Sequence, residues 1–221
     1  MGHLEQLLHI LAFLKKRPKL TLYFDPSDAI IDESMFNQDA SNQLLDHYRD
    51  AEEQAPMNMQ KPRGRQVQVT AFVDAFHAQD KVNRHSHASY IIFINRAPIL
   101  WYSKKQNTVE SSPFSSEFIA MKTCSEAIII GVRFKLRMFG VPVDTAANVL
   151  CDNEAVVNNS TKLESKLHEK HSSVAYHATR WVVAAKIIRV GKVHTGENLA
   201  DALTKRLSAA KRDYLFGNWT Y

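Results

Sequence analysis

Four acidic residues lie where secondary-structure elements are expected to begin or end: Asp74, Glu117, Asp152 and Asp201. Two of them follow runs that have the pattern of strands, and the other two fall early in helical patterns. Each acid taken alone also fits a structural role, because acids form turns at strand ends and stabilise helix N-termini. All four together, each beside apolar residues, favour a different interpretation in which the carboxylates converge on one site at the ends of the strands.

Convergence would define the chemistry of such a site. Carboxylates that are held close together repel one another and take up protons unless a cation joins them. Mg²⁺ and Mn²⁺ prefer oxygen ligands of this kind. Four carboxylates with room for substrate oxygens suit two ions about 3.5–4 Å apart, which is the arrangement of sites that cleave phosphodiesters. The four acids therefore predict a metal centre with nuclease chemistry.

The elements that must position these acids follow a regular order. Alternating apolar runs predict strands, and apolar residues at helical spacing predict helices. The predicted strands cover residues 67–73, 89–95, 98–103, 147–151 and 187–193. The predicted helices cover residues 115–139, a run from 153, 171–185 and 198–207. Three strands followed by alternating helices and strands indicate an α/β fold with a mixed sheet of about five strands, the first three antiparallel.

The beginning of the chain has a different pattern. Residues 3–14 have the apolar spacing of an amphipathic helix, and residues 20–24 predict a short strand. Residues 25–64 are rich in acids, amides and prolines, and they lack periodicity. This indicates a linker or an irregular surface segment with little regular structure. We therefore expect an N-terminal segment at 1–64, a domain at 65–215 and a C-terminal tail at 216–221.

Composition narrows the class of protein. Residues 1–60 hold 5 Lys/Arg and 10 Asp/Glu, and the remaining chain holds 23 Lys/Arg and 13 Asp/Glu. A basic body fits a polyanionic partner such as nucleic acid, although a solvated Lys/Arg surface has the same composition. Two cysteines argue against a disulfide scaffold. The sequence has no apolar run that would span a bilayer and no signal-peptide pattern, so we expect an intracellular protein.

Several short motifs within residues 65–215 occur in an order that resembles one known family. They are Phe72-Val-Asp-Ala-Phe-His-Ala78, Trp101-Tyr-Ser-Lys-Lys-Gln-Asn-Thr-Val109, Ser115-Ser-Glu-Phe-Ile-Ala120, Cys151-Asp-Asn153, Lys170-His171, Tyr176-His177 with Arg180, and Asn198-Leu-Ala-Asp-Ala-Leu-Thr-Lys205. Together they resemble the ribonuclease H domain of copia-type LTR retrotransposon Pol polyproteins. Residues 3–24 are similar to the segment that joins the reverse transcriptase to this domain. The chain has no adjacent Asp-Asp pair, so we expect the reverse transcriptase catalytic region to be missing.

The resemblance implies a ribonuclease H-like mixed sheet with helices on both faces and an N-terminal connection-type segment. It implies that Asp74, Glu117, Asp152 and Asp201 are catalytic and hold two Mg²⁺ ions, with Mn²⁺ as a substitute. The implied reaction is hydrolysis of the RNA strand of an RNA–DNA hybrid during reverse transcription. The implied partner is the reverse transcriptase domain of the same polyprotein, in a cytoplasmic virus-like particle or in the nucleus.

Five further residues are candidates for this site. His194 lies in the loop ahead of the last predicted helix; the resemblance implies a role in proton transfer or product release, and a solvent-exposed loop histidine is the alternative. Lys104, Lys105 and Gln106 follow the third predicted strand, where they either contact backbone phosphates of the hybrid or form a solvated turn. Asn153 follows the third acid, where it either bonds a ribose 2′-hydroxyl or caps a helix.

Two positions depart from the pattern of the family. Phe76 stands where many relatives carry a second Asp, and Ala175 stands where relatives usually have Arg. Both departures bear on activity rather than on the fold. Two alternative functions stay open: a non-catalytic nucleic-acid-binding or structural remnant of the polyprotein, and a different nuclease on the same fold, such as a transposase or resolvase. Metal-dependent cleavage of hybrids distinguishes ribonuclease H activity from the first alternative. A preference for duplex DNA or four-way junctions would indicate the second.

Overall fold

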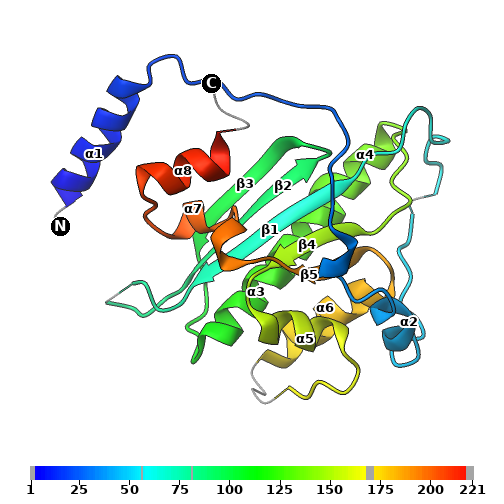
Figure 1. Cartoon of the computed structure of the whole chain (residues 1–221). Coiled ribbons are helices and arrows are strands. Elements are labelled where there is room, and N and C mark those ends of the chain that lie inside the picture. The colour runs from blue at the N-terminus through cyan, green and yellow to red at the C-terminus, as the bar shows by residue number, and fades with distance from the viewer. Residues whose placement is uncertain (1–2, 56, 81, 168–171, 218–221) are drawn as a thin grey trace.

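A mixed five-stranded sheet forms the centre of the protein, as the computed structural model shows (Figure 1). Its strands are β1 (Val69–Phe76), β2 (His87–Ile94), β3 (Ala97–Lys105), β4 (Ala147–Cys151) and β5 (Ile188–Lys192). They lie in the order β3-β2-β1-β4-β5. The first three strands pair antiparallel, whereas β4 runs parallel to β1 and β5 runs parallel to β4. The predicted α/β fold with an antiparallel first half is confirmed.

The register of the two central strands brings two of the acids to the same end of the sheet. Val73 of β1 lies opposite Cys151 of β4 in a parallel ladder. Asp74 and Asp152 are the next residues along these neighbouring strands. Their side chains therefore lie at adjacent positions at the carboxyl ends of β1 and β4, where the chain leaves β4.

One face of the sheet is covered by a layer of helices (Figure 1). They are α3 (Pro113–Glu126), a π-helical segment (Ala127–Arg133), α4 (Phe134–Met138), α5 (Glu154–Thr161) and α6 (Ser173–Ala184). Ala71 and Val73 belong to the same buried core as Phe118 and Met121 of α3. Because side chains alternate along a strand, the residues between them face the opposite side of the sheet.

The long predicted helix at 115–139 is present, but its middle is wound more loosely. The π-helical segment lies between α3 and α4, and the helical run ends before Gly140, whose φ of 72° suits a glycine. Arg133 ends the π-helical segment and is only 2% exposed. Its guanidinium donates to the carbonyl oxygens of Val143 and Thr145 and forms an ion pair with Glu53.

The opposite face of the sheet carries two short helices, α7 (Asp201–Thr204) and α8 (Ala209–Phe216). Ile91 and Phe93 of β2 form an apolar cluster there with Leu199 and Leu215. Helices on both faces are thus confirmed, but the predicted helix at 198–207 is wrong in its extent, and α8 was not predicted. The helix begins late because the side chain of Asn198 accepts a hydrogen bond from the Ala200 amide, which holds a turn instead.

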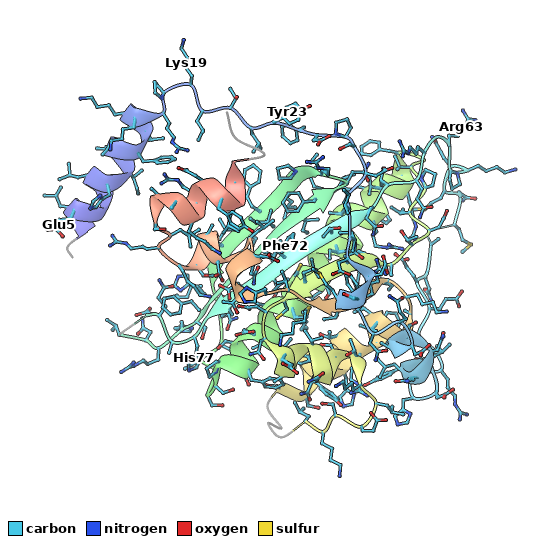
Figure 2. The ribbon with its side chains drawn as sticks, in the orientation of Figure 1. Glu5, Lys19, Tyr23, Arg63, Phe72 and His77 are labelled. Carbon is cyan, nitrogen blue, oxygen red and sulfur yellow. The ribbon has the colours of Figure 1, made fainter. Side chains whose placement is uncertain are left out.

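The N-terminal helix is present as predicted, as α1 (His3–Lys16). Its apolar side chains are exposed, and Figure 2 shows the helix marked by Glu5 standing apart from the body of the protein. Arg17, just beyond it, pairs with Asp213 of α8, and Arg212 lies over the ring of Phe13. The predicted strand at 20–24 is wrong, because only Leu22 forms an isolated bridge there.

Residues 25–64 carry little regular structure, as predicted, but parts of them pack against the body of the protein. They contain a 3-10 helix, η1 (Glu33–Met35), and a helix, α2 (Ala40–Leu45). Leu44 of α2 is 0% exposed within the main core. Phe36 forms an isolated antiparallel bridge with Gly191 of β5. These elements are three and six residues long, too short to produce a recognisable periodicity, so the prediction of little regular structure is confirmed, whereas their packing against the body of the protein was not predicted.

The structure describes residues 3–55, 57–80, 82–167 and 172–217. The motif Lys170-His171 and residues 218–221 of the predicted tail lie outside this part of the chain. None of the helices in the described part combines the length and the apolar character that crossing a lipid bilayer requires.

Candidate metal centre

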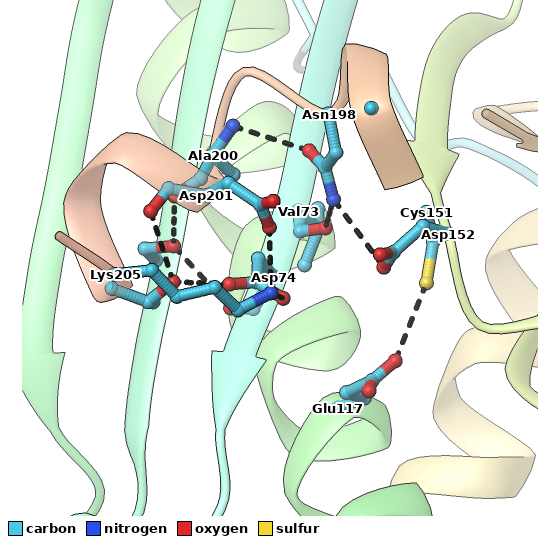
Figure 3. A network of polar contacts seen from close by, with 12 residues as sticks. Val73, Asp74, Glu117, Cys151, Asp152, Asn198, Ala200, Asp201 and Lys205 are labelled. Carbon is cyan, nitrogen blue, oxygen red and sulfur yellow. Dashed lines mark hydrogen bonds and ion pairs between the residues drawn. The ribbon is translucent and has the colours of Figure 1, made fainter. Parts of the chain in front are cut away.

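The four acids of the sequence analysis come together at the carboxyl ends of β1 and β4 (Figure 3). Carboxylate oxygens of Asp74, Asp152 and Asp201 lie within 4.8 Å of one another. A second group, with the same 4.8 Å spread, joins Glu117 and the Cys151 sulfur to Asp152. Asp152 therefore belongs to both groups and links them. The acids come from β1, α3, the loop after β4 and α7.

The buried side-chain amide of Asn198 holds Asp152 in place. The Asn198 side chain donates through Nδ2 to the Val73 carbonyl oxygen at 2.9 Å and to Asp152 Oδ1 at 3.4 Å. Its Oδ1 accepts from the Ala200 amide at 3.1 Å. A single side chain thus ties together strand β1, Asp152 and the turn that leads into α7 (Figure 3). Asn198 was not predicted for the site, although it begins the motif that contains Asp201.

Thr204, the last residue of α7, and Lys205, the residue after it, contact Asp74. Thr204 donates its hydroxyl to Oδ2 of Asp74. The ammonium of Lys205 lies 2.7 Å from Asp201 Oδ1 and 3.5 Å from Asp74 Oδ1. Burial alone would lower the pKa of Lys205, but the hydrogen bond to Asp201 and the nearby carboxylates raise it. Neither residue was predicted for the site, although positions three and four after an acid lie on the same side of a helix.

The electrostatics of the cluster favour protonated or cation-bound acids. Asp74 is 2% exposed, and burial raises its pKa to about 6 against the opposing effects of Thr204 and Lys205. Burial also raises the pKa of Glu117 to about 7, and the charges of Asp152 and Asp74 add to this rise. The protein's own cations and donors thus leave these two carboxylates incompletely compensated.

The donor set fits a hard divalent cation. The thiol of Cys151 lies 3.7 Å from Glu117 Oε2, and burial raises the pKa of this thiol well above its ordinary value. The sulfur therefore stays protonated and donates to the carboxylate. With the thiol protonated, the available ligands are carboxylate oxygens, which Mg²⁺ and Mn²⁺ prefer over softer ligand types.

The predicted phosphate-contacting residues lie at the end of β3. Lys104 and Lys105 are exposed, and the ammonium of Lys105 lies 3.6 Å from a carboxylate oxygen of Asp80. Gln106 is buried, and its amide donates to the Ser116 carbonyl oxygen at 2.7 Å. All three line a groove together with residues of α3 and of the start of α6. Gln106 thus connects β3 to α3, while the two lysines border the groove.

Asn153 and His194 have local partners that match their structural alternatives. Asn153 caps α5, since its Oδ1 accepts from the Ala155 amide at 2.9 Å, and it also hydrogen-bonds Glu117. His194 is exposed and caps a 3-10 helix (Thr195–Glu197), its Nδ1 accepting from the Gly196 amide at 3.0 Å. Within the described chain, the two groups of potential metal ligands do not include His194.

The remaining motif positions pack rather than line the acid cluster. Arg180 is buried and donates to the carbonyl oxygens of Asn159 and Lys162, which holds the end of α5. Phe76, at the end of β1, is partly exposed, and Ala175 is buried in α6.

No protein-family model matches the chain. A retrovirus-related Pol polyprotein from transposon TNT 1-94 of Nicotiana tabacum is 33% identical over 137 residues, which cover 62% of this chain and 10% of that protein. The corresponding polyprotein from transposon RE1 of Arabidopsis thaliana is 30% identical over 146 residues, which cover 66% of this chain and 10% of that protein. The chain thus spans about a tenth of the length of the curated relatives that it matches.

Solved structures with a similar arrangement of elements are more distant in sequence. LC11-RNase H1 in complex with an RNA/DNA hybrid has a TM-score of 0.48 at 16% identity, covering 62% of this chain and 93% of that one. RNase H1 from the halophilic archaeon Halobacterium salinarum NRC-1 has a TM-score of 0.47 at 13% identity, with the same shares covered. Identities and TM-scores this low assign no role to any residue of this chain.

Proposed function

This chain is a homologue of one segment of the copia-type retrotransposon Pol polyproteins, and from this premise we propose that it is a ribonuclease H-type hydrolase. The observation that carries the proposal is the convergence of four acids from four separate elements at one end of the sheet. The two acids with raised pKa values, Asp74 and Glu117, lack full compensation from the protein itself. A cluster of this kind supports metal-dependent hydrolysis of phosphodiesters.

Asp74, Asp152 and Asp201 would hold one Mg²⁺ ion, and Glu117 with Asp152 would hold a second, Mn²⁺ being the substitute. Bound there, the ions supply the Lewis-acid chemistry that activates a water for attack and stabilises the departing 3′ oxygen. The residues of the chain position the ligands. Asn198 keeps the shared ligand, Asp152, beside β1, and Thr204 fixes the orientation of the Asp74 carboxylate.

The proposed substrate is the RNA strand of an RNA–DNA hybrid. The groove bordered by Lys104 and Lys105 starts at the same end of the sheet as the acids and lies beside α3, which carries Glu117. Exposed lysines there suit contacts with backbone phosphates. Asn153 hydrogen-bonds Glu117 from the start of α5, a position from which it would contact a ribose 2′-hydroxyl. His194 is proposed to assist proton transfer or product release from its exposed loop.

The wider setting is proposed from the relatives. Residues 65–215 would form the nuclease domain, and residues 1–64 would belong to a segment of the kind that connects it to a reverse transcriptase. The reverse transcriptase domain of the same polyprotein would be the partner during reverse transcription. The site of action would be a cytoplasmic virus-like particle or the nucleus.

The test is cleavage of an end-labelled RNA–DNA hybrid in Mg²⁺, in Mn²⁺ and in EDTA. We expect metal-dependent cuts in the RNA strand alone. Asp144→Asn is the control for substitutions of the four acids. Asp144 is an exposed acid that precedes β4, whereas Asp152 follows it, so this variant should cleave as the wild type does. Hybrid binding without cleavage would support a non-catalytic remnant instead. Cleavage of duplex DNA or of four-way junctions in preference to hybrids would indicate a different nuclease.

A second experiment tests the docking surface. Replacing Lys104 and Lys105 together by Glu should weaken hybrid binding and flatten its dependence on salt concentration, because phosphate contacts release counterions. The measurement is the slope of log affinity against log salt by fluorescence anisotropy. An unchanged slope would assign the two lysines to the solvated surface.

A further inference from the structure

The acid cluster contains a cation of its own. The Lys205 ammonium lies 2.7 Å from Asp201 Oδ1 and 3.5 Å from Asp74 Oδ1, within the group of three carboxylates that lie within 4.8 Å of one another. Figure 3 shows the lysine side chain extended over these two acids, on the side of the cluster away from Glu117. The ammonium thus occupies space beside the same carboxylate oxygens that a metal ion would use.

The local backbone explains why the lysine reaches the cluster. Helix α7 has only four residues, and Lys205 follows it in an extended conformation, its amide donating to the Asp201 carbonyl oxygen at 2.8 Å. Closing the helical turn in this way returns the side chain toward Asp201. Thr204, one residue earlier, donates to Asp74 from the same turn. A single short turn therefore delivers one hydroxyl and one ammonium to two acids.

The side chain of Lys205 is also partly exposed and borders a cavity outside the acid cluster. Its side chain is 37% exposed, whereas that of Asp74 is 2% exposed. Lys205 lines a cavity between α1 and α8 whose other lining residues include Phe13, Arg17 and Asp213. Asp213 also lines this cavity, where its carboxylate already pairs with Arg17 at 2.8 Å and with Arg212 at 3.4 Å. The exposure of the Lys205 side chain, rather than a second acid, therefore lets its ammonium move from the acids toward solvent without any rearrangement of the sheet.

We propose that Lys205 is the resident counter-ion of the acid cluster, and that a divalent cation binding to Asp74 and Asp201 displaces its ammonium toward the cavity between α1 and α8. This inference rests on the proposed function, because it concerns the same acids. Without metal, Lys205 offsets the repulsion among the three aspartates. With metal, a positive charge a few ångströms from the ion opposes binding. Lys205 thus stabilises the metal-free protein and lowers its affinity for the metal ion.

The experiment compares Lys205→Met with Lys122→Met. Lys122 forms an ion pair with Glu126 four residues on, at 2.6 Å, and so loses the same kind of contact outside the cluster. Two quantities are measured: the melting temperature in EDTA, and the affinity for Mn²⁺ by titration calorimetry. For Lys205→Met we expect a lower melting temperature in EDTA and an affinity for Mn²⁺ that rises by about tenfold. Lys122→Met should match the wild type in both.

A conservative variant tests whether charge is the cause. Lys205→Arg keeps the positive charge and should bind Mn²⁺ within about twofold of the wild type. If Lys205→Met is unfolded in EDTA but folds on addition of Mn²⁺, the exchange of one cation for another is demonstrated directly. Tighter binding by Lys205→Arg and Lys205→Met alike would overturn the proposal, because it would show that charge is not the cause.

The outcomes separate this inference from the proposed function. A wild type that binds Mn²⁺, together with a Lys205→Met variant that binds it no more tightly, overturns the role of Lys205 and leaves the metal site intact. Absence of Mn²⁺ binding in both proteins overturns the metal site, and the displacement with it. A Lys205→Met variant that binds Mn²⁺ where the wild type does not supports the inference most strongly.

Discussion

The pKa values of buried carboxylates are shifted in opposite directions at two acidic sites of this protein. At one, Glu53 forms ion pairs with Arg133 and Arg137, at 2.7 and 2.5 Å. Burial raises the pKa of Glu53, but the two guanidinium groups outweigh this effect and lower it to about 2. At the other site, burial raises the pKa of Asp74 to about 6 and that of Glu117 to about 7.

The difference lies in how many cations each carboxylate receives. Two arginines pair with the single carboxylate of Glu53, and their contacts join residues 25–64 to the end of the π-helical segment and to α4. In the other cluster Asp74 and Asp201 share the ammonium of Lys205, and a carboxylate oxygen of Asp152 lies within 4.8 Å of theirs. A structural acid is satisfied within the fold, whereas a cluster left short of positive charge is suited to a cation from solution.

The largest effect that this comparison predicts is on activity. Asp74→Asn should reduce hybrid cleavage by orders of magnitude, because it removes a ligand charge. In EDTA its free energy of unfolding should hold or rise by about 1 kcal/mol, because repulsion among the acids is relieved. Cleavage assays and thermal melts, with and without Mg²⁺, measure the two effects. A variant that loses stability and shows no change in metal dependence would make Asp74 a structural acid like Glu53.

The next effect is on stability. Glu53→Gln should lower the free energy of unfolding by about 3 kcal/mol, because it leaves the buried guanidinium of Arg133 without a counter-charge. The measurement is urea denaturation, and the neighbouring exposed residue supplies the control, Glu52→Gln. Equal stability of the two variants would remove the contrast between the sites.

The dependence of stability on pH should show both sites in one metal-free curve. The folded-state pKa values of Asp74 and Glu117 are raised, so their unfavourable contribution is relieved as pH falls from about 7 toward their unfolded values of 3.8 and 4.5. The folded-state pKa of Glu53 is lowered, so its contribution is present above 4.5 and is lost as pH falls toward about 2. Stability should therefore peak near pH 5 and fall on both sides, more steeply where two acids titrate above the peak than where one titrates below it.

Variants assign the two limbs of that curve. Asp74→Asn should reduce the limb above pH 5 to the part that Glu117 contributes and leave the acidic limb unchanged, whereas Glu53→Gln should remove the acidic limb and leave the other unchanged. Chemical denaturation at a series of pH values in EDTA gives the curves. Loss of the same limb in both variants would show that the two sites titrate as one.

The smallest effect concerns a carboxylate that is exposed. Lys192 pairs with Glu154 at 2.5 Å on the surface. Solvent screens such a pair, so Lys192→Met should leave the melting temperature unchanged within error. A clear loss of stability would mean that the number of cations, rather than burial, decides what these carboxylates contribute.

Much of the fold follows from local patterns. The five strands, the helix that carries Glu117 and the adjacent placement of Asp74 and Asp152 could all be predicted, because apolar periodicity and the parallel pairing of neighbouring strands determine them. The roles of Thr204 and Lys205 were not predicted, because their contacts with Asp74 depend on how α7 packs against β1, which no local pattern determines. The spacing of four between Asp201 and Lys205 was nevertheless visible in the sequence.

The contacts of residues 25–64 could not be predicted in this way. Glu53 and Arg133 are 80 residues apart, and nothing in the local pattern of either residue identifies its partner. The same holds for Phe36 and Gly191, which meet across more than half of the chain. Charge and proline content indicate a surface segment correctly, but they do not reveal which surface the segment covers.

The bridge between Phe36 and Gly191 has a consequence for association between molecules. β5 is an edge strand, and edge strands with free backbone groups recruit strands from other molecules. Here the edge is shielded: Phe36 lies so close that a side chain at Gly191 would collide with its ring, and Arg189 stacks on the same ring while pairing with Glu33. A chain shortened to begin at residue 65 would lose this cover, and light scattering should detect its self-association at concentrations at which the full chain stays dispersed.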